Sequence, residues 1–388
     1  MSDLVTIAST AVSAYQRALG TVSNNIANVG SEGYSKQEVG LVENSPRDYG
    51  TSYLGTGVNV TGVKRLYDAF IEDSLRNATA ELETQGPMVD YANRVVNILG
   101  NENVSLLTAF DEFIDSARQL SADSSSVILR TQFLSKAEGL ASRFGELSGQ
   151  LQLVNQESQE RLNTDINELN RLSEQLSVVN QQLRKTRYAD RQPPALLDER
   201  DSILRKMSEL AKINISTASN GEVTVSVTSS KERGQLVNAD GARTLTAVFS
   251  ETDPAKVDLV INAYSKNPES VNGVSGGSVS GLVNFRQRVL APTLTNLDFL
   301  AKSLVSELNQ IHKEGIDLNG NDGKDLFQIS PIFQLESSRG TTEARLGPQL
   351  VDLEAYRASP IELSYNANAG QVNDLTVSGN FRTGDQIT

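Results

Sequence analysis

A proline-free run from Val127 to about Arg187 constrains the fold of this 388-residue chain more than any other feature. Apolar residues recur along it at helical spacing, as in an amphipathic helix. A helix of that length spans roughly 90 Å at 1.5 Å per residue, several times the length of a helix in a compact domain. The run therefore predicts an elongated chain that contains a long-helix rod domain.

Four leucines in this run, Leu162, Leu169, Leu176 and Leu183, stand seven residues apart. This spacing suits either a coiled coil between molecules or a helical bundle within one molecule. Polar Ser173 and Asn180 occupy other positions of the seam, which weakens the zipper alternative. We therefore expect the leucines to pack within the chain.

Further helices flank the long one. Their expected ranges are 68–84, 88–99, 103–120, 195–213 and 280–313. The first two are separated by Gly86-Pro87, because proline lacks an amide donor and clashes inside a helix.

Between 216 and 275 the hydrophobic period changes from 3.6 to 2. Val223, Val225 and Val227 alternate with Thr and Ser, and 257–262 forms a further strand-like run. These runs predict an antiparallel β domain inserted between helices, so the fold class is α+β and multi-domain. The expected division is 1–67 (N-terminal helix and Gly-rich connector), 68–215 with 278–331 (helical rod domain), 216–277 (inserted β domain) and 332–388 (β-rich segment).

The N-terminal residues 3–29 form an amphipathic helix with two neighbouring apolar seams. The first consists of Leu4, Ile7, Ala11, Ala14 and Ala18, and the second of Tyr15, Leu19, Val22, Ile26 and Val29. Both follow three- and four-residue steps, which place side chains on one stripe of a helix. Because alanine allows helix backbones to approach closely, we expect this coiled-coil helix to pack against another helix.

Composition excludes several functions. The net charge is −13 with no local Lys/Arg cluster, which argues against binding to nucleic acid or to an anionic membrane surface. The chain has no Cys, so it has no thiolate nucleophile and no thiolate metal site. No apolar run is long enough to cross a bilayer.

The remaining polar motifs have structural interpretations. Asp317–Asn321 begins like a calcium loop, but the sixth and twelfth positions are Asp322 and Gln328 instead of glycine and a carboxylate, so we expect a turn. His312, the single histidine, has no nucleophile motif beside it and is expected to be a surface or capping residue. We predict no catalytic, cofactor-binding or metal site.

Three motif blocks resemble the bacterial flagellar axial proteins, which comprise the rod, hook and hook-associated proteins. The first is SNNIANV at 23–29 followed by Gly33-Tyr34-Ser35-Lys36-Gln37, and the others lie at 55–76 and 276–327. The Leu-Leu-Asp-x-Arg-Asp stretch at 196–201 is also similar. Together the blocks most resemble the hook-associated protein 1 branch of the family, which forms the hook–filament junction.

The resemblance implies a structural subunit of the flagellum, exported by the type III apparatus without a cleaved signal peptide and located outside the cell. Its expected partners are further copies of itself in a ring or tube, the hook protein, the second junction protein and the export apparatus. The expected subunit-packing residues are Leu4, Ile7, Ala11, Ala14, Ala18, Leu19, Val22, Asn25, Ile26, Asn28, Gly33 and Tyr34. The family also has a C-terminal core helix that pairs with the N-terminal one, whereas this sequence is strand-like up to Thr388.

Two alternatives stay open. A hook or distal-rod protein shares the asparagine motif, although the GYSKQ wording and the 276–327 block count against it. A surface adhesin or glycan-binding protein would need a cluster of aromatic residues or carboxylates, and the Tyr and Phe residues here are scattered.

Overall fold

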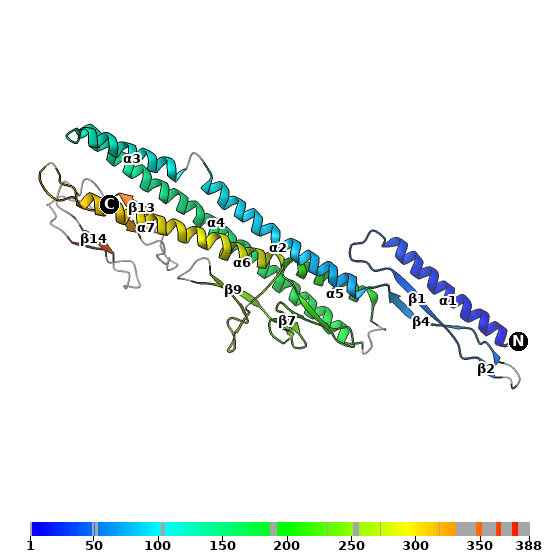
Figure 1. Cartoon of the computed structure of the whole chain (residues 1–388). Helices are drawn as coiled ribbons and strands as arrows, with labels where there is room; N and C mark the ends of the chain where they lie inside the picture. Colours follow the sequence, from blue (N-terminus) through cyan, green and yellow to red (C-terminus); the bar gives the residue numbers. More distant parts are fainter. Residues whose placement is uncertain are drawn as a thin grey trace. The chain divides into compact units, whose positions relative to one another are not determined.

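The structure is a computed structural model, shown in Figure 1. It describes residues 2–330, apart from 49, 51–52, 102–104, 187–191, 231, 251–255, 272 and 318. Beyond residue 330 it describes the strands at 347–350, 362–365 and 375–378.

Long helices and small antiparallel sheets make up the described chain, which confirms the α+β class. Contacts divide the chain into two compact units. The first consists of 1–93 and 155–289, and the second of 94–154 and 290–388. The division into four parts expected above stays a prediction.

The first unit begins with an N-terminal module, in which helix α1 (Ser2–Ala27) lies along a β-hairpin (Figure 1). The hairpin pairs β1 (Gln37–Glu43) with β4 (Val58–Arg65), and β2 (Arg47–Asp48) pairs with β3 (Tyr53–Leu54) between them. Gly57, with φ +101°, allows a close approach: a Cβ there would lie 2.4 Å from Oγ1 of Thr10 in α1. The module therefore depends on a glycine at this contact.

Helix α2 runs unbroken from Ala69 to Leu99 with Pro87 inside it, so the predicted break at Gly86-Pro87 is wrong. Proline inside a helix costs about 3 kcal/mol, but tertiary packing can offset that cost. Helix α6 (Gly277–Phe285) packs against α2 here, because a Cβ on Gly281 would lie 2.4 Å from the carbonyl oxygen of Thr84. Burial of neighbouring Ala80 adds to the packing that keeps α2 continuous.

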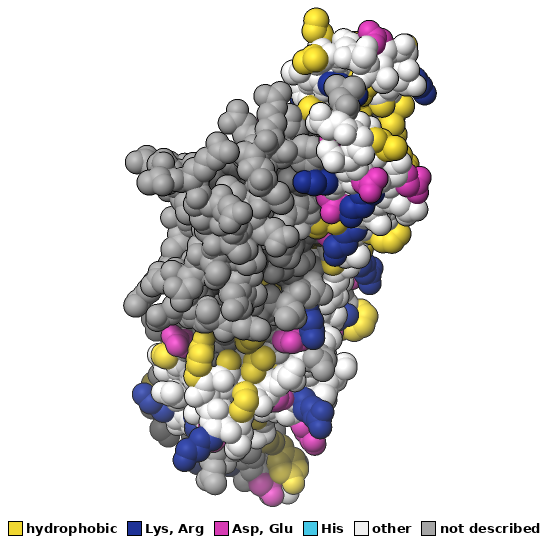
Figure 2. Space-filling view, turned by 90° about the vertical axis from the view of Figure 1, so that its left-hand side faces the viewer, with side chains coloured by type: hydrophobic (Ala, Val, Ile, Leu, Met, Phe, Trp, Pro, Cys, Tyr) yellow, Lys and Arg dark blue, Asp and Glu magenta, His cyan; other side chains and the backbone are white. Residues whose placement is uncertain are grey.

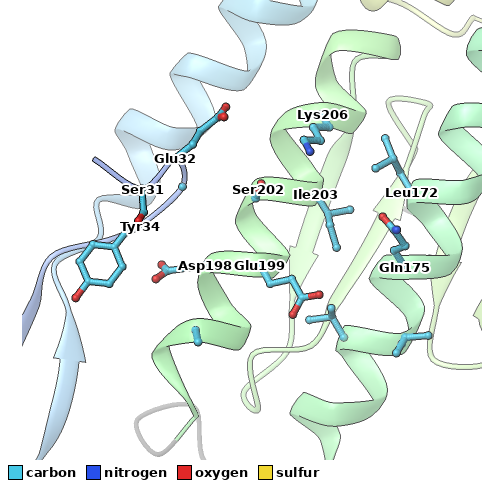
Figure 3. A pocket seen from close by; sticks show the side chains of 14 residues that line it. Ser31, Glu32, Tyr34, Leu172, Gln175, Asp198, Glu199, Ser202, Ile203 and Lys206 are labelled. Carbon is cyan, nitrogen blue, oxygen red and sulfur yellow. The ribbon is translucent and has the colours of Figure 1, made fainter. Parts of the chain in front are cut away.

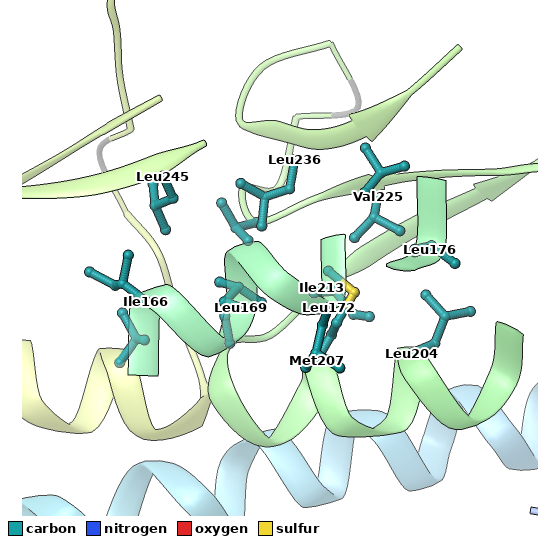
Figure 4. Close-up of a cluster of buried hydrophobic side chains, with 14 of the residues drawn as sticks. Ile166, Leu169, Leu172, Leu176, Leu204, Met207, Ile213, Val225, Leu236 and Leu245 are labelled. Atoms are coloured by element: carbon teal, nitrogen blue, oxygen red, sulfur yellow. The ribbon is translucent and has the colours of Figure 1, made fainter. Parts of the chain in front are cut away.

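The predicted long helix is α4 (Val127–Arg184), and its four heptad leucines are each 0% exposed. They pack in one core with α5 (Pro194–Leu210) and with strands that follow, as Figure 4 shows for Leu169, Leu204 and Val225. The expectation of packing within the chain is confirmed. The residues just before Arg187 form no helix, and Arg187 itself lies outside the described residues.

The strands between the helices form two antiparallel sheets, which confirms the predicted β region. One has the order β5–β6–β7–β8 and the other the order β11–β10–β9. Their bounds are β5 Asn214–Thr217, β6 Val223–Ser226, β7 Gln235–Asn238, β8 Gly241–Ala242, β9 Leu245–Phe249, β10 Val257–Ile261 and β11 Glu269–Ser270. Valine side chains of β6 face the leucines of α4, which is why the strand alternates with period two.

The predicted helix at 280–313 is divided into α6, a π-helical segment at Arg286–Leu290 and α7 (Ala291–Lys313). The segment begins at Arg286, which is fully buried and whose Nη1 donates to the carbonyl oxygen of Asn155 and to Oγ of Ser158. Single-turn π segments are a recognised way to insert one extra residue into a helix.

The second unit contains α3 (Leu106–Ala122), the first part of α4, and α7. Its core includes Phe113, Phe144 and Phe327. Strand β12 (Phe327–Ser330) pairs with β13 (Gly347–Leu350), and β14 (Glu362–Tyr365) pairs with β15 (Leu375–Ser378). The rest of the predicted β-rich segment at 332–388 lies outside the described residues.

Candidate subunit-packing surface

Helix α1 has an inner face that packs against its own hairpin. Ala14 is 1% exposed, and Ile7, Ala11 and Ala18 are partly buried. The helix contacts β1 and β4, so the alanine seam meets strands where another helix was expected. Small side chains and Gly57 together explain the close approach of helix and hairpin. Leu4, assigned to this seam from its spacing, is 74% exposed.

The outer face of α1 carries an uncovered apolar stripe, which we call the outer seam. Its seven members are 51% to 87% exposed; Val5 and Val12 stand seven residues apart, and the steps from Val12 onward are three or four residues. They are Val5, Val12, Tyr15, Leu19, Val22 and Ile26 on α1 and Val29 in the turn just after it. Val5, Val12, Leu19 and Ile26 stand seven residues apart, which is the spacing of a coiled-coil seam. The predicted packing residues omit Val5 and Val12, although the seven-residue spacing identifies them.

The asparagine motif holds the reversal of the chain between α1 and β1. Asn25 is central: its Oδ1 accepts from the Gln37 amide at 2.9 Å and from the Tyr34 hydroxyl at 2.8 Å, and its Nδ2 donates to the Gln37 carbonyl. Asn28 Nδ2 donates back to the Asn24 carbonyl at 2.9 Å. Gly33 adopts φ +80° in the same turn. The structure therefore gives these predicted packing residues contacts inside the chain, and their role between subunits stays a prediction.

Helix α2 has a second exposed stripe that the sequence analysis did not identify. Leu75, Leu82 and Val89 are spaced seven apart and are 50%, 70% and 49% exposed, and Ile71 one turn earlier is 61% exposed. On the other face of α2, Ala80 is buried and the ring of Tyr91 packs on Phe285. The seven-residue spacing of Leu75, Leu82 and Val89 was the signal that could have revealed this face.

A buried ion network joins the N-terminal module to α5. Nη1 of Arg65 lies 2.7 Å from Asp198, and its Nη2 lies 2.8 Å from Asp201. Asp198 also accepts a hydrogen bond from the Ser35 amide, and Asp201 accepts from Arg200. Beside this network is a cleft of about 550 Å³ between the 31–34 loop, α4 and α5 (Figure 3).

Two other carboxylates of the first unit, Glu72 and Glu209, have shifted pKa values. The hydrogen bond from Arg205 lowers the pKa of Glu72 below its usual value, and this pair connects α2 to α5. Burial, with Glu83 and Glu32 nearby, raises the pKa of Glu209.

On the described part of the face in Figure 2, acidic and basic side chains are interspersed with hydrophobic ones.

The polar motifs near residue 317 form a turn. Asp317 accepts hydrogen bonds from the amides of Asn319 and Asn321, and the Asn321 bonds lower the pKa of Asp317. His312 lies in the last turn of α7 with Nδ1 against the Lys324 carbonyl. Within the described residues, no cluster of His, Cys, Asp and Glu has the arrangement of a metal site, and no helix has the length and apolarity needed to cross a membrane.

Comparison with known proteins adds a family. A family model described as "Flagellar hook-associated protein FlgK helical domain" matches residues 92–327. Proteins named flagellar hook-associated protein 1 are similar over nearly the whole chain. The one from Escherichia coli K12 is 27% identical over 98% of this chain and 70% of its own length, and the one from Salmonella typhimurium LT2 is 28% identical over 100% and 69%. The Bacillus subtilis protein is 23% identical, over 96% of this chain and 79% of its own length.

A solved structure has a similar fold. The flagellar hook junction protein FlgK from Burkholderia pseudomallei superposes with a TM-score of 0.57 at 24% identity. The match covers 66% of this chain and 47% of that one, so the matched part of this chain corresponds to less than half of the solved protein.

Proposed function

The chain belongs to the flagellar hook-associated protein FlgK family, the structural proteins of the hook–filament junction, and we propose that it connects hook and filament through the outer seam of α1. A member of this family associates with other axial components of the flagellum, an extracellular appendage. The proposal adds which surface makes the association.

The outer seam is the observation that carries the proposal. Six apolar side chains in coiled-coil spacing are exposed on α1 and Val29 is exposed just after its end, while the opposite face of that helix is already packed. Burial of apolar surface is worth about 25 cal/mol per Å², so a continuous seam gives a strong driving force for association. Contiguous exposed apolar patches mark interaction sites.

The exposed stripe of α2 supplies a second packing surface. Two different surfaces on one subunit allow heterologous contacts, in which one face of a subunit meets a different face of the next. Such contacts between identical subunits generate a ring when the rotation closes and a helical tube when it does not. We propose that this chain associates with further copies of itself in one of these arrangements.

The finer set of partners follows from the family. We propose the hook protein on one side, the second junction protein on the other, and passage to the cell exterior through the flagellar type III export apparatus. The proposed role is structural throughout, and it includes no reaction, cofactor, nucleic acid or membrane.

Deletion of the gene in the source bacterium tests the proposal. We expect bare hooks under the electron microscope and unpolymerised flagellin in the medium, both reversed by the wild-type gene. Loss of the hook itself would identify a rod or hook protein instead, and normal filaments would contradict the junction role.

A variant complementation then tests the surface. The double substitution Leu19→Glu with Ile26→Glu places charge on the outer seam, so we expect secreted protein but bare hooks. The matched control is Glu157→Gln on α4, which should restore filaments. Restored filaments with the double variant would show that the outer seam is not the packing surface.

A further inference from the structure

The Leu-Leu-Asp-x-Arg-Asp stretch at 196–201 has no role in the function proposed above, yet three of its four charged residues are buried, whereas Glu199 is exposed. Asp198, Arg200 and Asp201 are 9%, 7% and 2% exposed. Charged side chains are seldom fully buried unless they are paired. Their partners therefore indicate what the stretch does.

The main partner is Arg65, the last residue of β4, whose side chain is 6% exposed. Its two Nη atoms are divided between two carboxylates, with Nη1 at 2.7 Å from Asp198 and Nη2 at 2.8 Å from Asp201. Those carboxylates are three residues apart and so lie on one face of α5. A planar guanidinium that bridges two fixed carboxylates fixes both the distance and the orientation of the end of β4 relative to α5.

The same aspartates fasten neighbouring parts of the chain. Asp198 accepts a hydrogen bond from the amide of Ser35, just before β1, so both strands at the root of the hairpin are held at one carboxylate. Asp201 accepts from Arg200, whose Nη1 donates to the carbonyl of Gly221 between β5 and β6. The ring of Tyr67 covers the Arg65 guanidinium at 4.8 Å.

Apolar contact at this point is incomplete. The cleft of about 550 Å³ lies between the 31–34 loop and helices α4 and α5, with Ser202 and Ile203 among its lining residues (Figure 3). Close packing of side chains would fix the 31–34 loop against α4 and α5 by shape alone. Because a cleft lies between them, directional bonds have to fix the arrangement.

We infer that Arg65, Asp198 and Asp201 form a joint that fixes the orientation of the N-terminal module, residues 2–65, on α5. Two positive and two negative side chains balance in the network, so no net charge is buried. A buried ion network adds little net stability, because desolvation offsets its attraction, and its best-attested use is to select one arrangement. The joint therefore orients the outer seam of α1; its value for assembly rests on the proposed function, whereas the orientation itself does not.

The distance between two spin labels on the isolated chain tests the joint directly. The chain has no native Cys, so Ser13→Cys on α1 and Glu174→Cys on α4, both exposed, carry the only labels. We expect one narrow distance peak in the otherwise unchanged chain. Arg65→Gln should abolish the narrow peak, and Arg65→Lys, which keeps the charge without the fork, should widen it less.

The matched control is Arg118→Gln, which removes an exposed ion pair with Asp115 and should keep the narrow peak. Circular dichroism should show unchanged helix in every variant. A narrow peak at the original distance in folded Arg65→Gln would overturn the proposal. If Arg65→Gln did not fold, Asp198→Asn, which keeps the side-chain volume, would decide: broadening supports the joint and an unchanged peak overturns it.

Discussion

Helices α1 and α4 carry the same seven-residue apolar spacing with opposite outcomes. In α4, Leu162, Leu169, Leu176 and Leu183 are 0% exposed and pack with α5 and the sheets. In α1, Val5, Val12, Leu19 and Ile26 have the same spacing and are 56% to 70% exposed. Spacing therefore identifies the apolar face of a helix, but it does not tell whether the chain covers that face itself.

The difference lies in what each helix packs against. The leucine face of α4 is covered by α5 and by strands from other parts of the chain, whereas α1 is covered by its hairpin on the face opposite its larger apolar side chains. The inner face of α1 carries small alanine side chains that pack against the hairpin. Its larger apolar side chains stay exposed on the outer face. A helix with this division is suited to hold its place in the subunit with one face and meet a neighbour with the other.

The largest expected effect compares the two seams directly. Leu169→Ala should lower the free energy of unfolding by about 2 to 5 kcal/mol, because it leaves a cavity in a closed core. Its matched control, Leu19→Ala, removes the same atoms from an exposed position and should cost less than about 0.5 kcal/mol. Urea unfolding of the isolated chain measures both. Equal losses would contradict the distinction between covered and uncovered seams.

Substitution of Gly57 breaks the inner face of α1 instead. Gly57→Ala should destabilise the N-terminal module by about 1 to 3 kcal/mol, because the new Cβ would lie 2.4 Å from Thr10 Oγ1 at φ +101°. Gly55→Ala is the matched control, since a Cβ there meets nothing within 4 Å. Hydrogen exchange should accelerate in α1 while α4 keeps its protection. Faster exchange throughout α4 would show that the module is not a separable part of the first unit.

The ion pair between Glu72 and Arg205 makes part of the covered core sensitive to pH. The lowered pKa of Glu72 means that its contribution is present above its unfolded pKa of 4.5 and is lost as the pH falls through the folded value. The free energy of unfolding of the wild-type chain should exceed that of Glu72→Gln by about 1 kcal/mol at pH 7. The two free energies should converge in acid. A difference that grows as the pH falls would contradict this assignment.

The smallest expected effect is a gain. Burial and the nearby Glu83 raise the pKa of Glu209, so its charged form destabilises the folded chain as the pH rises through that pKa. Because solvent screens the exposed Glu209 side chain, Glu209→Gln should stabilise the chain by only a few tenths of a kcal/mol (roughly 0.3) at pH 7 and by less at pH below the usual value of 4.5. Thermal unfolding at the two pH values measures the difference. A loss of stability at pH 7 would mean that Glu209 has a favourable partner.

Local periodicity was enough to predict most of the elements. The proline-free run predicted α4, alternation of valines predicted β6, and 257–262 predicted β10, because burial on one face imposes a pattern that is visible in sequence. Proline at 87 misled the prediction, since the contact of α2 with Gly281 links residues far apart in the chain. The alanine seam of α1 indicated close packing correctly but did not reveal that its partner is a hairpin.

The candidate surface was predicted less completely than the fold. Leu19, Val22 and Ile26 were identified by spacing, yet the exposed stripe of α2 was not, because exposure depends on which neighbours fold onto a helix. The ion pair of Arg65 with Asp198 joins residues 133 positions apart, so no local sequence pattern predicts it. Asn25 and Tyr34 were singled out by the family motif, and the structure adds the hydrogen bonds through which they hold the turn.

The most direct test of the central claim, that the outer seam of α1 packs against another subunit, is site-specific photo-crosslinking in intact flagella. A benzophenone amino acid replaces Leu19 in the outer seam or, as control, Glu174 on the exposed side of α4. We predict covalent products between two axial subunits from position 19 in greater yield than from position 174. Equal yields from the two positions, or products from position 19 that lie only within one chain, would contradict the claim.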